Sequence, residues 1–185
     1  MQFEATQEIT KELSGSERLL WSGMPRKGLM FRGTDVFLVP FSLLWCGFAI
    51  FWEYGAVTHE APFFFRLWGI PFVVIGLYFV FGRFFFEAKQ REKTMYGLTS
   101  ERIIIISGVF KKNVKSLNLK NLNEVSLSER TDHSGTITFG SGNSRYSMFS
   151  GMAWPGVNNY LPPSFEMIEN AKSVHEMIRN AQKDA

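Results

Sequence analysis

The hydrophobic positions of this chain are concentrated in two long stretches. Residues 36–52 read VFLVPFSLLWCGFAIFW and residues 67–82 read LWGIPFVVIGLYFVFG, and neither stretch contains a charged side chain. A membrane-spanning helix needs about 20 mostly apolar residues, and both stretches reach that length with their apolar flanks. Both are apolar around the whole helical circumference, whereas a helix buried in a soluble domain usually keeps a polar stripe. The pattern therefore favours two membrane-spanning helices over two core helices of a soluble protein.

This hairpin divides the chain into five predicted parts. They are an N-terminal cytoplasmic segment (1–34), a first spanning helix (35–57), an outer loop (58–61), a second spanning helix (62–86) and a cytoplasmic domain (93–183). Gly69 and Gly76 are seven residues apart and share one face of the second helix. They either allow the two helices to approach closely or are incidental.

Aromatic and basic side chains mark the ends of the predicted hairpin. Trp52, Tyr54 and Trp68 flank the connection, where interfacial aromatic residues are expected. Arg66 and Arg83 lie near the ends of the second helix, from which long side chains reach the headgroups. We therefore predict these five residues to be membrane-interface anchors.

Lysine and arginine are distributed asymmetrically around the two stretches. They occur before the first stretch and after the second, at Arg26, Lys27, Arg32, Arg83, Lys89, Arg91 and Lys93. Residues 53–61, which contain the connection, hold none, although they hold Glu53 and Glu60. The positive-inside rule then places both termini in the cytoplasm. No charged-then-apolar N-terminal leader is evident, so no cleavable signal peptide is expected.

After residue 93 the pattern changes to short strands separated by turns. The predicted strands are 93–98, 102–107, 114–119, 124–129, 135–139 and 145–149. Residues 141–144 (SGNS) read as the hairpin connection between the last two strands. Ser164, which follows two prolines, is a candidate N-cap for a closing helix. That helix has an apolar stripe made of Met167, Ala171, Val174, Ile178 and Ala181.

Several of these runs resemble the bacterial pleckstrin-homology-like domain family. Residues 96–108 (YGLTSERIIIISG) resemble its opening hairpin, and residues 135–139 (GTITF) resemble its later Gly-x-Ile-x-Phe strand. Trp21, Gly23 and Pro25 are similar to the segment before the first spanning helix of membrane-anchored members. Further apolar matches are Leu117, Leu119, Leu122, Val125, Phe165, Ile168, Ala171, Val174 and Ile178. The sequence departs from the family pattern at Ser100, where asparagine is common, and at His175, where an aromatic residue is usual.

The resemblance implies an α+β membrane protein. A two-helix transmembrane hairpin would be followed by a PH-like, seven-stranded, partly open antiparallel β-barrel with a C-terminal capping helix. It also implies a multi-pass protein of the bacterial inner membrane. It supplies no specific function, because bacterial members are not assumed to bind phosphoinositides.

The remaining composition excludes most other functions. The net charge of +3 is too small to indicate a nucleic-acid-binding protein. His59, His133, His175 and the single Cys46 lack metal-ligand spacing, and Cys46 has no partner for an intrachain disulfide. The glycines around residues 135–142 lack the Gly-Lys-Ser/Thr of a phosphate loop and are better explained by turns. We therefore expect no enzyme, cofactor, metal or small-molecule substrate. We also expect no buried carboxylate in the hairpin, which argues against a lone transporter.

One basic cluster supports a second reading. Lys111, Lys112 and Lys115 lie at a predicted hairpin tip, where they either contact anionic lipid headgroups or form an ordinary solvated turn. The first hypothesis is a membrane-tethered interaction module that binds a protein or peptide, for example through an exposed strand edge, or assembles into a homo-oligomer. The alternatives are anionic-lipid sensing through the lysines and an accessory subunit of a membrane enzyme or transport complex.

Overall fold

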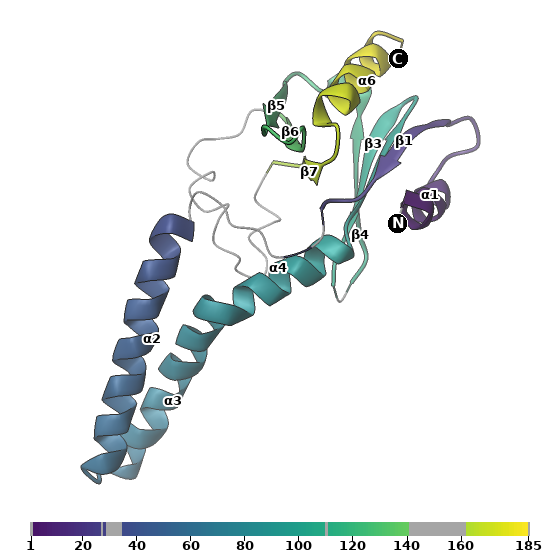
Figure 1. Ribbon diagram of the computed structural model, residues 1–185. Helices are drawn as coiled ribbons and strands as arrows, with labels where there is room; N and C mark the ends of the chain where they lie inside the picture. Colours follow the sequence, from purple (N-terminus) through teal and green to yellow (C-terminus); the bar gives the residue numbers. More distant parts are fainter. Residues whose placement is uncertain (1, 27, 29–34, 110, 141–161, 185) are drawn as a thin grey trace.

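The computed structural model describes residues 2–26, 28, 35–109, 111–140 and 162–184. Figure 1 shows a helical hairpin that projects from a domain of strands and shorter helices. The helices are α1 (Gln2–Thr10), α2 (Asp35–Thr58), α3 (Phe63–Leu77), a π-helical segment η1 (Tyr78–Gly82), α4 (Arg83–Glu92), a 3-10 turn η2 (Leu119–Asn121) and α6 (Ala171–Asp184). The described strands are β1 (Leu19–Gly23), β2 (Met95–Thr99), β3 (Arg102–Ser107), β4 (Asn113–Asn118), β5 (Val125–Glu129), β6 (Gly135–Phe139) and β7 (Ser164–Ile168).

The hairpin consists of α2 and α3, which lie side by side (Figure 1). α3, η1 and α4 form one helical run over Phe63–Glu92, longer than the predicted second helix. Pro40 lies inside α2 and Pro71 inside α3, which is unusual in water and better tolerated within a membrane.

The hairpin is inserted into the domain between two adjacent strands. β1 precedes it and β2 follows it, and the two strands pair antiparallel, with Gly23 opposite Tyr96. The chain therefore leaves the sheet and returns to it at the same end. The apolar alternation of LLWSG in β1 is too weak to predict a strand, so this pairing was open from the sequence alone.

Two antiparallel sheets make up the rest of the domain. The first has the order β1-β2-β3-β4 and the second has the order β5-β6-β7. The described strands form two separate antiparallel sheets and do not close into a barrel. Together with the C-terminal helix α6 they make a PH-like arrangement. The strands predicted at 102–107 and 135–139 are confirmed as β3 and β6. The strand predicted at 145–149 and its hairpin connection lie outside the described residues.

The continuous isoleucine run of β3 is explained by burial on both faces. Ile103 and Ile105 enter the main core, which includes Phe139, Phe165 and the buried face of α6. Ile104 and Ile106 face the opposite way and pack with Ile9 of α1. The N-terminal helix therefore covers the outer face of the first sheet. A Cβ at Gly97 would lie 2.6 Å from Cγ2 of Ile9, so this close approach requires glycine.

The closing helix begins later than its sequence predicts. Residues Ser164–Ile168 form strand β7 instead of the first turns of a helix, and α6 starts at Ala171. β7 holds one extra residue opposite β6, and Met167 has a φ of 49° at this bulge. The bulge puts Phe165 and Ile168, three residues apart, on the same buried side, which imitates helical spacing. The stripe Ala171, Val174, Ile178 and Ala181 is confirmed as the buried face of α6.

Candidate functional site

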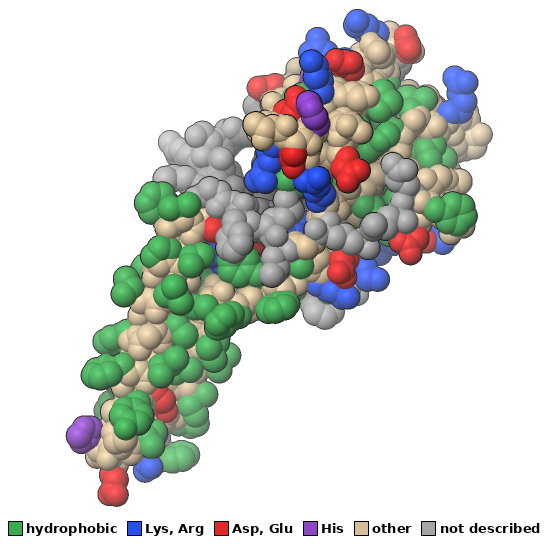
Figure 2. Space-filling view, in the orientation of Figure 1, with side chains coloured by type: hydrophobic (Ala, Val, Ile, Leu, Met, Phe, Trp, Pro, Cys, Tyr) green, Lys and Arg blue, Asp and Glu red, His purple; other side chains and the backbone are tan. Residues whose placement is uncertain are grey.

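The hairpin exposes an unusually large apolar surface. Of the large hydrophobic side chains exposed in the described residues, 24 lie between Val36 and Phe85 and only three lie elsewhere. Figure 2 shows hydrophobic side chains along the length of the hairpin and charged side chains gathered over the domain. Both helical runs are long and apolar enough to cross a membrane, and only 22% and 11% of their most apolar windows are buried. A core helix of a soluble protein would be mostly buried.

The two helices meet through small residues. A Cβ at Gly76 would lie 3.0 Å from Cα of Cys46, so only glycine permits this contact between α3 and α2. A Cβ at Gly69 would collide with the side chain of Glu53. Both glycines therefore lie at the helix interface, and the alternative that they are incidental is wrong.

Glu53 corrects one expectation drawn from the apolar pattern. That pattern predicts no buried carboxylate in the hairpin, but Glu53 lies within α2, whose predicted range already included it. Its Oε2 atom is buried and has no hydrogen-bond partner among the described residues. The expectation failed because hydropathy locates a charge along the chain but does not show on which helix face it lies.

The five predicted interface anchors fall into two groups. Trp52, Tyr54, Arg66 and Trp68 are exposed around the tip of the hairpin. Arg83 instead points inward at the other end of the hairpin, where its side chain is 3% exposed. Its Nη2 atom lies 3.0 Å from Oδ1 of Asp35, the first residue of α2. Arg83 therefore links the two helices where their apolar surfaces end.

Polar contacts connect the domain to the base of the hairpin. Arg91 of α4 donates a 3.0 Å hydrogen bond to the carbonyl oxygen of Gly28, which follows β1. Arg26 forms an ion pair of 2.5 Å with Asp132 in the β5–β6 turn. The hydrogen bonds from Ser134, and then the Arg26 guanidinium, lower the pKa of Asp132 to about 2. The segment after β1 is therefore held by both α4 and the second sheet.

The predicted lysine cluster is not an isolated basic patch. Lys112 lies 2.7 Å from Glu12 and 3.3 Å from Glu8, two residues of the N-terminal segment. The hydrogen bond to Glu12 is the main cause that raises the pKa of Lys112. Lys111 is exposed in the β3–β4 turn, and Lys115 is half-buried in β4. The glutamates were missed as partners, although Glu4, Glu8 and Glu12 recur every four residues, a spacing that places them on one helix face.

A cavity of about 430 Å³ opens beside these charges. It lies between α1, the start of β2 and the β3–β4 turn. Glu4, Glu8, Lys93 and Lys112 contribute to its walls together with the apolar side chain of Met95. It therefore combines positive, negative and apolar groups in one concave surface.

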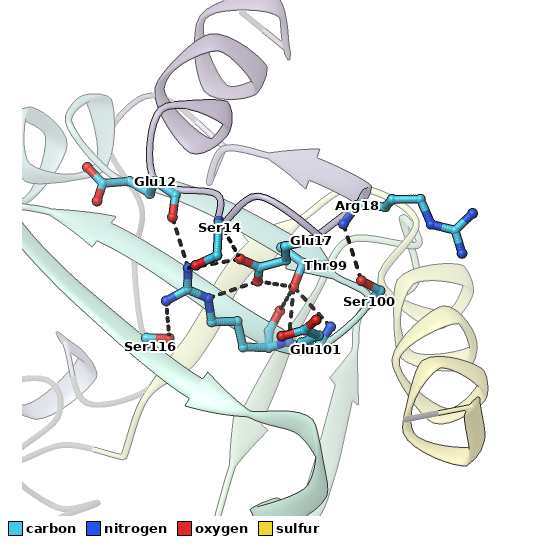
Figure 3. Close-up of polar contacts among 9 residues, drawn as sticks. Glu12, Ser14, Glu17, Arg18, Thr99, Ser100, Glu101 and Ser116 are labelled. Carbon is cyan, nitrogen blue, oxygen red and sulfur yellow. Dashed lines mark hydrogen bonds and ion pairs between the residues drawn. The ribbon is translucent and has the colours of Figure 1, made fainter.

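A second polar network joins the chain after α1 to the β2–β3 turn (Figure 3). Arg102 donates hydrogen bonds to both carboxylate oxygens of Glu17, and Thr99 donates to Oε1 of Glu17 at 2.6 Å. The hydrogen bond from Arg102 is the main cause that lowers the pKa of Glu17 to about 2. Arg102 also contacts the carbonyl oxygen of Glu12 at 2.9 Å. The Glu17 carboxylate thus accepts hydrogen bonds from Arg102, Thr99 and the backbone N–H of Ser14, which is typical of a structural clamp.

Metal-binding geometry is not evident in the part of the chain that the structure describes, where no group of three or more His, Cys, Asp or Glu residues could hold an ion. His133 lies 3.3 Å from Glu129 at the end of β5, in an exposed turn. His59 and His175 lie in separate parts of the molecule, at the hairpin tip and on α6.

Comparison with known proteins identifies the family of this fold. A model described as the bacterial PH domain matches residues 38–179. No curated protein matches the chain. A solved structure, a DUF1696 family protein with a pleckstrin-homology domain from Shewanella loihica PV-4, is similar at 11% identity and a TM-score of 0.42, covering 98% of this chain and 93% of that one. Since the family model spans most of the sequence, from within α2 through strands β2 to β7 and into α6, the chain belongs to the bacterial PH domain family.

Proposed function

We propose that the chain is a non-catalytic interaction module, tethered to the bacterial inner membrane by α2 and α3, with its PH-like domain at the cytoplasmic face. The exposed apolar surface of the hairpin carries this proposal, because two helices with so few buried residues need an apolar solvent. The membership in the bacterial PH domain family supports a binding module by analogy of fold.

The topology supports an even number of membrane crossings. β1 and β2 lie on either side of the hairpin in the sequence, yet they pair in one sheet. Both must therefore be in the same compartment, and the hairpin must enter and leave the membrane on the same side. The basic flanks and the lysine-free and arginine-free connection favour the cytoplasm for that compartment.

The edge of the first sheet is our candidate for protein or peptide binding. β4 is the last strand in the order β1-β2-β3-β4, and Val114 on it is 39% exposed. An extended peptide or a second copy of this chain could add to such an edge by backbone hydrogen bonds, with side-chain contacts giving specificity. An accessory role in a membrane complex would use the same edge.

A labelling experiment tests the tether and its orientation. In a Cys46→Ser background, single cysteines are placed at His59, in the hairpin tip, and at Lys172, on the exposed face of α6. We expect a membrane-impermeant maleimide to label the first in intact spheroplasts and the second only after lysis. Labelling of both sites before lysis, or extraction of the protein by alkaline carbonate, would contradict the tether.

Photocrosslinking tests the binding edge. A photoreactive amino acid at Val114 should give a discrete crosslinked product in cells, and the same residue at Lys172 should not. A product of twice the chain mass would identify a homo-oligomer, and another mass would identify a different protein. Equal crosslinking at both positions would refute a specific role for β4.

Anionic-lipid contact through Lys111, Lys112 and Lys115 is the second candidate. The ends of β3 and β4 that lead into their turn point toward the side from which the hairpin extends, which favours contact with a membrane (Figure 1). The ion pairs of Lys112 with Glu8 and Glu12 weaken this candidate. Replacing all three lysines by glutamine in the full-length protein should leave its binding to anionic lipid unchanged if the turn is merely solvated.

A further inference from the structure

The cavity beside α1 lies close to the point where the chain leaves the hairpin. Lys93 in its wall follows the last residue of α4, and Met95 begins β2. Its volume of about 430 Å³ is within the roughly 300–1,000 Å³ typical of small-molecule sites. Met95 and Ile106 supply apolar wall, so the cavity can accept a ligand that is only partly polar.

Its charges are arranged for a ligand that carries both signs. Glu4 and Lys93 line the same cavity, and among the described residues neither has an ion-pair partner. Glu8 and Lys112 lie beside them and form an ion pair of 3.3 Å. An anion placed here would meet two carboxylates, and a cation would meet two ammonium groups. A dipolar ligand can satisfy Glu4 and Lys93 at the same time.

Given the proposed tether, the cavity wall at Lys93 lies near the membrane surface. The apolar surface of the hairpin ends near Arg83, and the ten residues of α4 then extend about 15 Å along the helix axis. α4 leans away from the axis of α2 (Figure 1), so its ten residues rise by less than this along the hairpin axis, and Lys93 in the cavity wall directly follows them. The headgroup layer of one leaflet is roughly 5–8 Å deep, and long lysine side chains can reach into it.

We propose that this cavity binds the headgroup of a zwitterionic aminophospholipid, with its phosphate at Lys93 and its primary ammonium at Glu4. The primary ammonium donates hydrogen bonds to carboxylates, which a trimethylated choline group cannot do. An anionic glycerol headgroup offers no cation for Glu4. This site rests on the proposed tether, which brings the cavity next to membrane lipids. It makes a zwitterionic lipid, and not an anionic one, the expected ligand near the β3–β4 turn.

Lipid titration of the full-length protein in a mild detergent tests the site, with bound lipids counted by native mass spectrometry. The probes are phosphatidylethanolamine, phosphatidylcholine and phosphatidylglycerol with identical acyl chains. We expect phosphatidylethanolamine to bind at least about five-fold more tightly than the other two, the ratio for one charge contact of about 1 kcal/mol. Glu4→Gln should abolish this preference. Lys93→Gln should weaken the binding of all three lipids, because they share the phosphate, and Lys93→Arg should restore it.

Matched controls and a soluble probe make the test decisive. Glu124→Gln and Lys120→Gln change the same charges at exposed positions outside the cavity and should leave both the affinities and the preference intact. Tightest binding of phosphatidylglycerol, no preference in the native protein, or equally tight binding of free phosphoethanolamine would each overturn the proposal. Failure of the tether is recognised separately, because the maleimide pattern in spheroplasts does not depend on lipid preference.

Discussion

Arg102 donates two hydrogen bonds to the carboxylate of Glu17, which lies 85 residues earlier in the chain, at 2.8 Å from Nε to Oε1 and 2.9 Å from Nη2 to Oε2. The Glu17 side chain is 1% exposed, so this contact replaces the water that the carboxylate loses on folding. Thr99 supplies a third hydrogen bond. The N-terminal segment is thereby fixed to the β2–β3 turn, which follows the hairpin in the sequence.

Removing the guanidinium should destabilise the domain. Arg102→Met leaves the Glu17 carboxylate buried without its main partner, and we expect a loss of about 2–4 kcal/mol in the free energy of unfolding. Chemical denaturation of the detergent-solubilised protein measures it. Arg18→Met is the control, because the Arg18 side chain is exposed nearby, and it should change stability by less than about 0.5 kcal/mol. Equal losses in both variants would show that the ion pair contributes little.

The same pair makes stability depend on pH in the acid range. The pKa of Glu17 falls from its ordinary 4.5 to about 2 in the folded protein. A lowered folded pKa gives stability that is complete above about pH 4.5 and is lost as the pH falls toward 2. The unfolding midpoint of the native protein should therefore decrease between pH 5 and pH 2 more steeply than that of Glu17→Gln. Parallel curves for the two proteins would contradict this assignment.

Helix packing in the hairpin depends on Gly76. Gly76→Leu places a side chain where Cα of Cys46 lies 3.0 Å from an added Cβ, and we expect a cost of about 1–3 kcal/mol. Gly47→Leu is a matched control on α2, because no atom lies within 4 Å of its added Cβ. Thermal unfolding in detergent should separate the two variants. A midpoint for Gly76→Leu that matches Gly47→Leu would mean that the helices pack differently.

The ion pair between Asp35 and Arg83 should show strong energetic coupling. Both side chains are nearly buried, so Asp35→Asn and Arg83→Gln each leave a poorly compensated charge behind. The double variant removes both charges and should be more stable than the sum of the two single losses predicts, by about 1–3 kcal/mol. A double-mutant cycle of unfolding free energies gives this value. Additive losses would show that the two groups do not interact in solution.

The local patterns of the sequence predicted much of the fold. Ile103 and its neighbours predicted β3, and the stripe from Ala171 to Ala181 predicted the buried face of α6. The pattern failed at β7, where the bulge at Met167 gives Phe165 and Ile168 a helical spacing. It also failed to find β1, whose partner lies beyond the hairpin. Both failures arise because strand pairing is decided by distant residues.

The candidate site was predictable only in part. Lys112 was found as a basic residue in a turn, but its partners Glu8 and Glu12 lie 104 and 100 residues away. Glu4 and Lys93 belong to no recognisable sequence motif. They line one cavity only because α1 packs on the first sheet.

The sequence by itself determined two long apolar segments, the basic flanks around them and the change to short strands, because hydropathy and periodicity are properties of neighbouring residues. The tertiary structure alone decided that the hairpin is an insertion between paired strands, that α1 covers the outer face of the first sheet and that opposite charges share a cavity at the base of the hairpin. Those relationships join residues far apart in the chain, and they exist only once burial of Ile9, Ile104 and Ile106 has fixed the elements against one another.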